Sequence, residues 1–165
     1  MMRLDLKDIL QKDGAASFAY APDFSTLAFS SISRFLGPVQ ASGCVTSSAG
    51  VLTLSGEVRV QALCLCDRCG AEFQRELSFP LDTPLAESLL DTENPDIFPI
   101  EEDAVDLDEV VTTAFVLGLD SKMLCRPNCK GLCPRCGQNW NDGACGCGSE
   151  PDSRLAVLGQ LLELE

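Results

Sequence analysis

Cysteines are the residues of this sequence whose type and spacing could do chemistry. There are ten in 165 residues, and six of them lie within residues 125–147. The core of this stretch is Cys133-Pro134-Arg135-Cys136-Gly137, a zinc knuckle in which the two-residue gap lets both sulfurs reach one ion and the glycine permits a positive φ. A closed structural zinc site takes four ligands. The nearest pair completes a predicted zinc site of Cys133, Cys136, Cys145 and Cys147.

A second pair with a two-residue gap, Cys66 and Cys69, is also followed by a glycine. Together with Cys125 and Cys129, which the first set leaves over, this pair could bind a second zinc ion and join the first half of the chain to its tail. The alternative is that Cys66 and Cys69 are small buried thiols at a turn. The remaining two cysteines, Cys44 and Cys64, fit no ligand spacing and are expected in the core.

Other chemistries also use clustered cysteines. Disulfides belong to oxidising compartments, but Asp5 and Asp8 interrupt the region where a signal peptide would be apolar, so we expect a soluble, cytoplasmic protein. A redox pair or an iron–sulfur cluster would accept the same thiols, yet their number and the knuckle favour zinc. The chain has no histidine, which excludes Ser-His-Asp and Cys-His catalysis. No apolar run approaches the roughly 20 residues that span a bilayer.

Charge is distributed unevenly along the chain. The net charge of −13 opposes general nucleic-acid binding, because affinity for phosphate comes from Lys and Arg. No basic residue lies between Arg75 and Lys122, where acids are frequent, and a basic protein would suit this acidic region. The cysteine-rich stretch instead carries four cations that are candidates for contact with a partner or with RNA: Lys122, Arg126, Lys130 and Arg135.

The elements that must position these residues are mainly strands. Alternating apolar residues predict strands near residues 2–6 and 18–20, a long strand over 51–62, and another over 73–79, with residues 66–70 at a hairpin tip. Together they predict an antiparallel β meander or partial barrel.

The second half is predicted to contain two helices. Residues 82–104, acidic and with three prolines, are expected to connect the strands to a helix and to hold one short strand near 97–100. Asp106 is the expected N-cap of a helix at about 106–119, with Glu109 completing a capping-box-like pattern. Its apolar face is expected to pack on the sheet. Leucines at helical spacing predict a last helix over 152–164, which is expected to pack on the core; the alternative is that it packs on a partner.

These expectations define an α+β protein. It would have a mainly β domain at 1–120, a Cys-rich zinc ribbon or knuckle module at 121–150 and a terminal helix at 151–165.

Five motifs occur in order along the chain: Cys66-Asp67-Arg68-Cys69, the acidic helix start Val105–Glu109, the run Leu124–Gly137, Asn141-x3-Cys145-x-Cys147, and Asp152-x-Arg154-Leu155-Ala156-x-Leu158. Through these motifs the chain resembles, over nearly its whole length, the YceD family of bacterial and plastid proteins, which is named for accumulation of large-subunit ribosomal RNA. The chain departs from the family at Asp120, Trp140 and Ser153, where Pro, Leu and Pro are usual. None of these three is a predicted ligand.

The resemblance implies a role in synthesis, processing or assembly of the large ribosomal subunit, without a defined catalytic activity or small-molecule substrate. The implied partners are 23S rRNA, a large-subunit ribosomal protein, or both. Docking of the acidic region on a basic ribosomal protein is favoured slightly over RNA contact through the four cations. The alternatives are a thiol redox enzyme, a nuclease with carboxylates gathered around Mg²⁺, and a zinc-ribbon module that recruits an unrelated protein.

Overall fold

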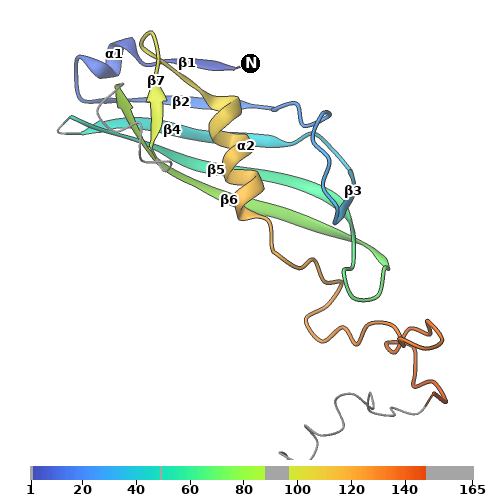
Figure 1. The fold of residues 1–165 in the computed structure, drawn as a ribbon. Helices are drawn as coiled ribbons and strands as arrows, with labels where there is room; N and C mark the ends of the chain where they lie inside the picture. The colour runs from blue at the N-terminus through green and yellow to red at the C-terminus, as the bar shows by residue number, and fades with distance from the viewer. Residues whose placement is uncertain (1, 49, 88–96, 148–165) are drawn as a thin grey trace, which may run out of the picture.

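A six-stranded sheet dominates the computed structural model, which describes residues 2–48, 50–87 and 97–147 (Figure 1). The sheet has the order β2-β4-β5-β6-β7, and β3 pairs with the far end of β5. All pairs are antiparallel except β6 with β7. The strands are β2 (Gly14–Tyr20), β3 (Ile32–Phe35), β4 (Gln40–Ser48), β5 (Val51–Leu65), β6 (Glu72–Glu87) and β7 (Phe98–Ile100). The α+β class and the antiparallel meander, here β4 to β6 of an open sheet, are confirmed.

The β5–β6 hairpin is longer than the sequence analysis predicted. Its register runs from Leu52 opposite Leu85 to Leu65 opposite Glu72, so the paired strands extend roughly 45 Å at about 3.3 Å per residue. The prediction that residues 82–87 belong to a connecting segment was wrong, because Leu81 and Leu85 continue the alternation of buried residues. Pro84 is tolerated because, in the described part of the chain, β7 pairs with β6 only beyond it.

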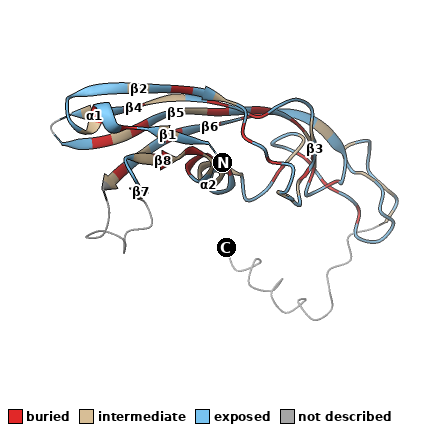
Figure 2. Cartoon of the chain, turned by 90° about the horizontal axis from the view of Figure 1, so that it is seen from above, coloured by how far each residue is buried: buried red, intermediate tan, exposed pale blue. Residues whose placement is uncertain are grey.

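Only one face of the sheet is buried. On β5 the buried residues alternate with exposed or half-buried ones (Figure 2), as in antiparallel sheets that have one face in water. Helix α2 (Leu107–Gly118) crosses the buried face (Figure 1) and places Phe115 against the rings of Phe24, Phe29, Phe35 and Phe79, at centroid distances of 4.9, 5.3, 6.0 and 5.0 Å. At Gly118 a Cβ would lie 2.4 Å from the Phe79 ring, so the helix ends on a residue that must be small.

A second, two-stranded sheet lies directly before α2 in the chain. Strand β1 (Arg3–Asp5) pairs with β8 (Ala104–Asp106), and the short helix α1 (Lys7–Leu10) follows β1. The Asp106 carboxylate accepts the amides of Asp108 at 3.0 Å and Glu109 at 3.4 Å, which confirms it as the N-cap. The sequence analysis placed no strand at residues 104–106 and no helix at 7–10. The predicted helix over 152–164 lies outside the described residues.

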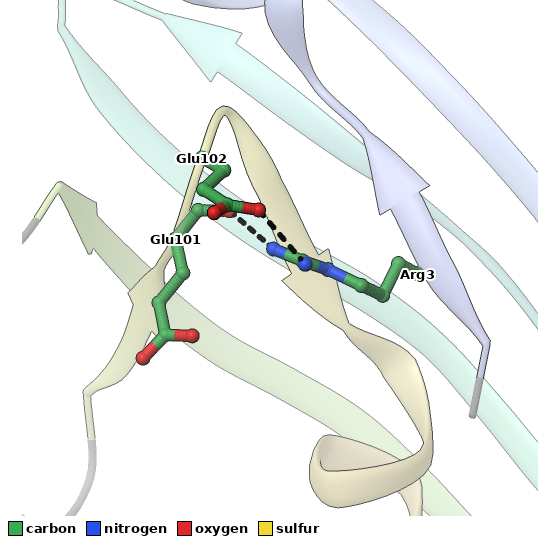
Figure 3. Close-up of polar contacts among 3 residues, drawn as sticks. All are labelled: Arg3, Glu101 and Glu102. Carbon is green, nitrogen blue, oxygen red and sulfur yellow. Dashed lines mark hydrogen bonds and ion pairs between the residues drawn. The ribbon is translucent and has the colours of Figure 1, made fainter.

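The turn between β7 and β8 has two residues with left-handed backbone, Glu102 at φ 51° and Asp103 at φ 59°. A positive φ at both central residues is the geometry of a type I′ hairpin turn, which normally favours Asn and Gly. Here Arg3 holds the turn from β1 (Figure 3): its guanidinium donates to the Glu101 carbonyl at 2.6 Å and pairs with the Glu102 carboxylate at 3.2 Å. These contacts offset part of the conformational cost of placing acidic residues at this turn.

Beyond α2 the chain runs to the tip of the β5–β6 hairpin and continues as loops through residue 147 (Figure 1). An isolated bridge between Leu132 and Asn139 is the only strand-like pairing described in this stretch. Among the described residues, neither helix is long and apolar enough to cross a membrane.

Candidate metal centres

The first candidate centre joins the tip of the β5–β6 hairpin to the tail. Cys66 and Cys69 come from the turn, Cys125 and Cys129 from the tail, and all four sulfurs lie within 4.8 Å of one another. The Sγ atoms of Cys66 and Cys129 are 3.7 Å apart, and those of Cys69 and Cys125 are 3.8 Å apart. Three of these thiols are buried and Cys125 is half-buried. The cluster can hold one metal ion shielded from water.

The two residues between Cys66 and Cys69 hold the tail in place. The Asp67 amide donates to the Met123 carbonyl at 2.8 Å, and the Met123 amide donates to the Asp67 carboxylate at 2.5 Å. Arg68 donates from its guanidinium to the Cys129 carbonyl at 2.8 Å. The sequence analysis quoted these two residues as part of a motif and did not assign them this role. The signal in the sequence that could have indicated this role is that both residues are charged although they lie inside a tight turn.

The second candidate centre is formed within the tail itself. The sulfurs of Cys133, Cys136, Cys145 and Cys147 also lie within 4.8 Å of one another. This cluster is less covered than the first, since Cys133 is buried, Cys136 is exposed, and Cys145 and Cys147 are half-buried. The structure therefore brings together both sets of four cysteines that the spacing grouped.

Both centres use the same turn. In the first, the Cys66 amide donates to the Ala71 carbonyl at 3.0 Å and the Gly70 amide donates to the Cys66 carbonyl at 2.8 Å. In the second, the Cys133 amide donates to the Gln138 carbonyl at 2.8 Å and the Gly137 amide donates to the Cys133 carbonyl at 2.9 Å. The glycines have φ of 68° and 73°, in the left-handed region that glycine adopts without steric cost. The shared sequence Cys-x-Arg-Cys-Gly thus encodes one conformation twice.

The thiols within each cluster differ in acidity. Burial by itself raises the pKa of Cys66, but amide hydrogen bonds from Cys125, Cys69 and Arg68 outweigh it and lower the pKa to about 6. Burial and the neighbouring Cys66 thiol raise the pKa of Cys125 to about 12. A thiolate is the form that binds metal, so a cluster in which Cys66 is already acidic and its three partners lie close by is suited to take up a cation and release the remaining protons.

Trp140 lowers the pKa of one thiol at the second centre. Its indole Nε1–H lies 3.3 Å from the Cys145 sulfur, and this hydrogen bond, together with the Cys147 amide, lowers the pKa of Cys145 to about 6. Interaction with Cys136, followed by burial, raises the pKa of Cys147 to about 12. The sequence analysis treated Trp140 as a departure from the family pattern without a role at the site.

Asn141 connects the two centres. It lies in the loop of the second centre, yet its Nδ2 donates to the Cys129 sulfur of the first at 3.3 Å, and its Oδ1 accepts the Lys130 amide at 2.9 Å. The bond to sulfur is the main cause of a lowered pKa at Cys129. Asn139 fixes the Asn141 side chain by accepting from its Nδ2 at 2.8 Å. The sequence analysis named Asn141 in a motif but assigned it no contact.

The four cations of the tail, Lys122, Arg126, Lys130 and Arg135, are exposed. Lys130 lines an open groove of about 530 Å³ together with Arg68, Cys129, Trp140 and Ala144. Of the two cysteines expected in the core, Cys64 is fully buried, as predicted, whereas Cys44 on β4 is half-buried.

The part of the chain that contains both clusters is similar to known proteins. The family described as large ribosomal RNA subunit accumulation protein YceD matches residues 54–162, more than half of the chain. The chain belongs to the YceD family. The matched region includes all eight cysteines of the two clusters. The resemblance stated from the motifs is therefore confirmed, and the YceD description refers to ribosomal RNA and to no catalytic activity.

Individual relatives agree with membership of the YceD family. An Arabidopsis thaliana protein named large ribosomal RNA subunit accumulation protein YCED homolog 1, chloroplastic, is 28% identical over 158 residues, covering 76% of this chain and 49% of that protein. Uncharacterised proteins of Mycobacterium bovis and Mycobacterium tuberculosis are 32% identical over 94 residues, covering 54% of this chain and 45% of theirs. The chain spans about half the length of these curated relatives. No solved structure matches it significantly.

Proposed function

We propose that this chain is a non-catalytic zinc-binding factor in biogenesis of the large ribosomal subunit, and that it acts by binding a ribosomal protein or 23S rRNA. The observation that carries the proposal is the pair of four-cysteine clusters inside the region that matches the YceD family. The family description supplies the ribosomal context, and the clusters supply the means by which the tail is held in a binding conformation.

The sulfur spacing supports zinc as the bound metal. Zinc–sulfur bonds of about 2.3 Å in a tetrahedron place the sulfurs about 3.8 Å apart. The two distances across the first cluster, 3.7 and 3.8 Å, fit that edge length. Amide, indole and carboxamide donors near the sulfurs would offset the negative charge of an all-thiolate site.

A four-thiolate site also supports a structural role for the metal. Catalytic zinc keeps an open position for water or substrate, whereas four protein ligands close the coordination sphere. In this arrangement Cys66, Cys69, Cys125 and Cys129 would fix the tail on the hairpin, and Cys133, Cys136, Cys145 and Cys147 would shape the tail beyond it.

Two surfaces are candidates for partner contact. The β7–β8 turn presents Glu101, Glu102 and Asp103, all exposed, and suits a basic ribosomal protein. The cysteine-rich tail, with its four exposed cations, lies at the other end of the hairpin (Figure 1) and is the candidate surface for RNA.

Metal content and partner capture test the proposal together. Protein purified without added metal is expected to contain two zinc ions per chain by elemental analysis, and the Cys66→Ser and Cys133→Ser variants one each. Affinity purification from cells with the metal retained should recover large-subunit RNA or proteins. Cys44→Ser, which lies outside both clusters, is the matched control. Zinc-free protein, or captured material without large-subunit components, would contradict the proposal.

A further inference from the structure

The groove between the two metal centres has the chemistry of a nucleotide site. Its lining combines one large aromatic ring, two cations and no acidic residue: Arg68, Cys129, Lys130, Trp140 and Ala144. We propose that this groove binds single-stranded RNA, with a base stacked on the Trp140 indole and the adjoining phosphate facing Arg68 and Lys130. The inference deepens the proposed function, because it names the partner class of the tail.

Trp140 is positioned to serve as a stacking platform. It is the only tryptophan of the chain and is 36% exposed, although a large aromatic side chain gains free energy from burial. Its amide donates to the Gly131 carbonyl at 3.0 Å, and its ring nitrogen donates to the Cys145 sulfur at 3.3 Å. Because the indole is held by its polar edge, a base can stack on its face without breaking either hydrogen bond.

The two cations are held beside this ring by contacts that leave donors for a ligand. Arg68 donates from Nη1 to the Cys129 carbonyl. This hydrogen bond uses one of the five N–H donors that a guanidinium carries. Lys130 is fixed through its backbone amide by Asn141, while its side chain is exposed. Asn141, which connects the two metal centres, therefore also fixes the backbone of one of the two cations.

The charge of the tail with both centres filled favours single-stranded RNA over duplex RNA. Each filled zinc–tetrathiolate centre carries a net charge of −2, so the two centres nearly cancel the four cations of the tail. Phosphate attraction by itself is therefore weak, and stacking must contribute much of the affinity. A base can reach an aromatic face only when it is unstacked from its neighbours, as in loops and single-stranded ends.

Direct binding with matched tryptophan variants tests the inference. The zinc-loaded full chain is titrated with fluorescently labelled hexauridylate and hexaadenylate, and with a duplex RNA of the same length. Trp140→Phe keeps an aromatic face and loses the N–H donor to Cys145, whereas Trp140→Leu keeps apolar bulk and loses the face. Zinc content is measured for every variant, so that loss of metal is separated from loss of stacking.

Single-stranded RNA is expected to bind and to quench the fluorescence of Trp140. The Phe variant should retain the affinity within about threefold, and the Leu variant should lose roughly tenfold or more. Lys130→Gln should weaken binding and reduce the log–log salt slope by about one, while Lys12→Gln, at the opposite end of the sheet, should do neither. Unchanged affinity in a zinc-replete Leu variant, equal or tighter binding of the duplex, or tighter binding of an acidic peptide would overturn the inference.

These outcomes are separable from failure of the proposed function. A protein that holds two zinc ions and captures large-subunit components, but binds neither RNA oligomer, would refute the groove and leave the proposed function intact. Tight binding of the oligomers without capture of large-subunit components would support the groove and contradict the ribosomal role.

Discussion

The two cysteine knuckles share a turn and differ in how each site is completed. At Cys66–Gly70 the remaining sulfurs come from a segment about sixty residues away in sequence, and the cluster is mostly buried. At Cys133–Gly137 they come from the same loop, and the cluster is partly exposed. The local motif therefore sets the backbone conformation, while the source of the other two ligands decides whether a site joins distant parts of the chain or only shapes its own loop.

Removing a ligand of the first centre should have the largest effect. Cys66→Ser is expected to lose one zinc ion and to release residues 121–130 from the hairpin, since zinc–thiolate binding contributes folding free energy on the order of 10 kcal/mol. Amide hydrogen exchange in that segment should become faster by about a hundredfold or more. If the variant keeps two zinc ions, or keeps the protection of the segment from hydrogen exchange, the first centre does not hold the tail on the hairpin.

Removing a ligand of the second centre should have a local effect. Cys133→Ser is expected to lose one zinc ion and the order of residues 131–147, while the sheet and the first centre remain as they are. Hydrogen exchange should show protection retained at residues 121–130 and in β5 and β6. Loss of both ions in this variant would mean that the two centres fold as one unit.

Asn141 offers an intermediate test, because it belongs to the second loop and donates to a sulfur of the first centre. Asn141→Ala is expected to lower the zinc affinity of the first centre by about tenfold, as is usual when an outer hydrogen bond to a metal ligand is removed. Competition with a chelator measures this change. Asn128→Ala, an exposed asparagine of the same tail, is the matched control and should leave the affinity unchanged.

The smallest effect is expected far from both knuckles, at the acidic β7–β8 turn. Replacing Glu101, Glu102 and Asp103 together by Gln, Gln and Asn should slow association with a basic ribosomal partner a few-fold at low salt, and less at high salt. Stopped-flow association at two ionic strengths measures the effect, and both metal centres should stay filled. If the rate is unchanged while Lys122, Arg126, Lys130 and Arg135 prove essential, the tail is the docking surface.

The sequence predicted the second cluster and gave the first as one of two alternatives, because the gap and the glycine of each knuckle are local signals whereas the partners of Cys66 and Cys69 lie far along the chain. It also placed α2 to within a residue or two, since the cap at Asp106 and the apolar spacing agree with each other. The pairing of β1 with β8 could not be predicted, because each strand has only three residues and the two are about 100 residues apart in sequence. The end of β6 was misassigned because Asp82 and Pro84, on its exposed positions, resemble residues of a connecting segment.

Contacts that hold the candidate site were the least predictable part. Asp67, Arg68 and Asn141 act through hydrogen bonds to backbone atoms or sulfurs that lie 56, 61 and 12 residues away in sequence, and such contacts leave no periodic pattern. The division of the chain into domains at 120 and 150 stays a prediction.

The length of the β5–β6 hairpin sets the distance between the two surfaces that could contact partners. One end of the ribbon carries the acidic turn and the other carries the cysteine-rich tail, separated by roughly 45 Å of paired strand (Figure 1). A rigid spacer of that length can keep one partner at its outer end while its tip enters a crevice of a large particle. A protein of this modest mass can therefore bridge two components of an assembly that do not touch each other.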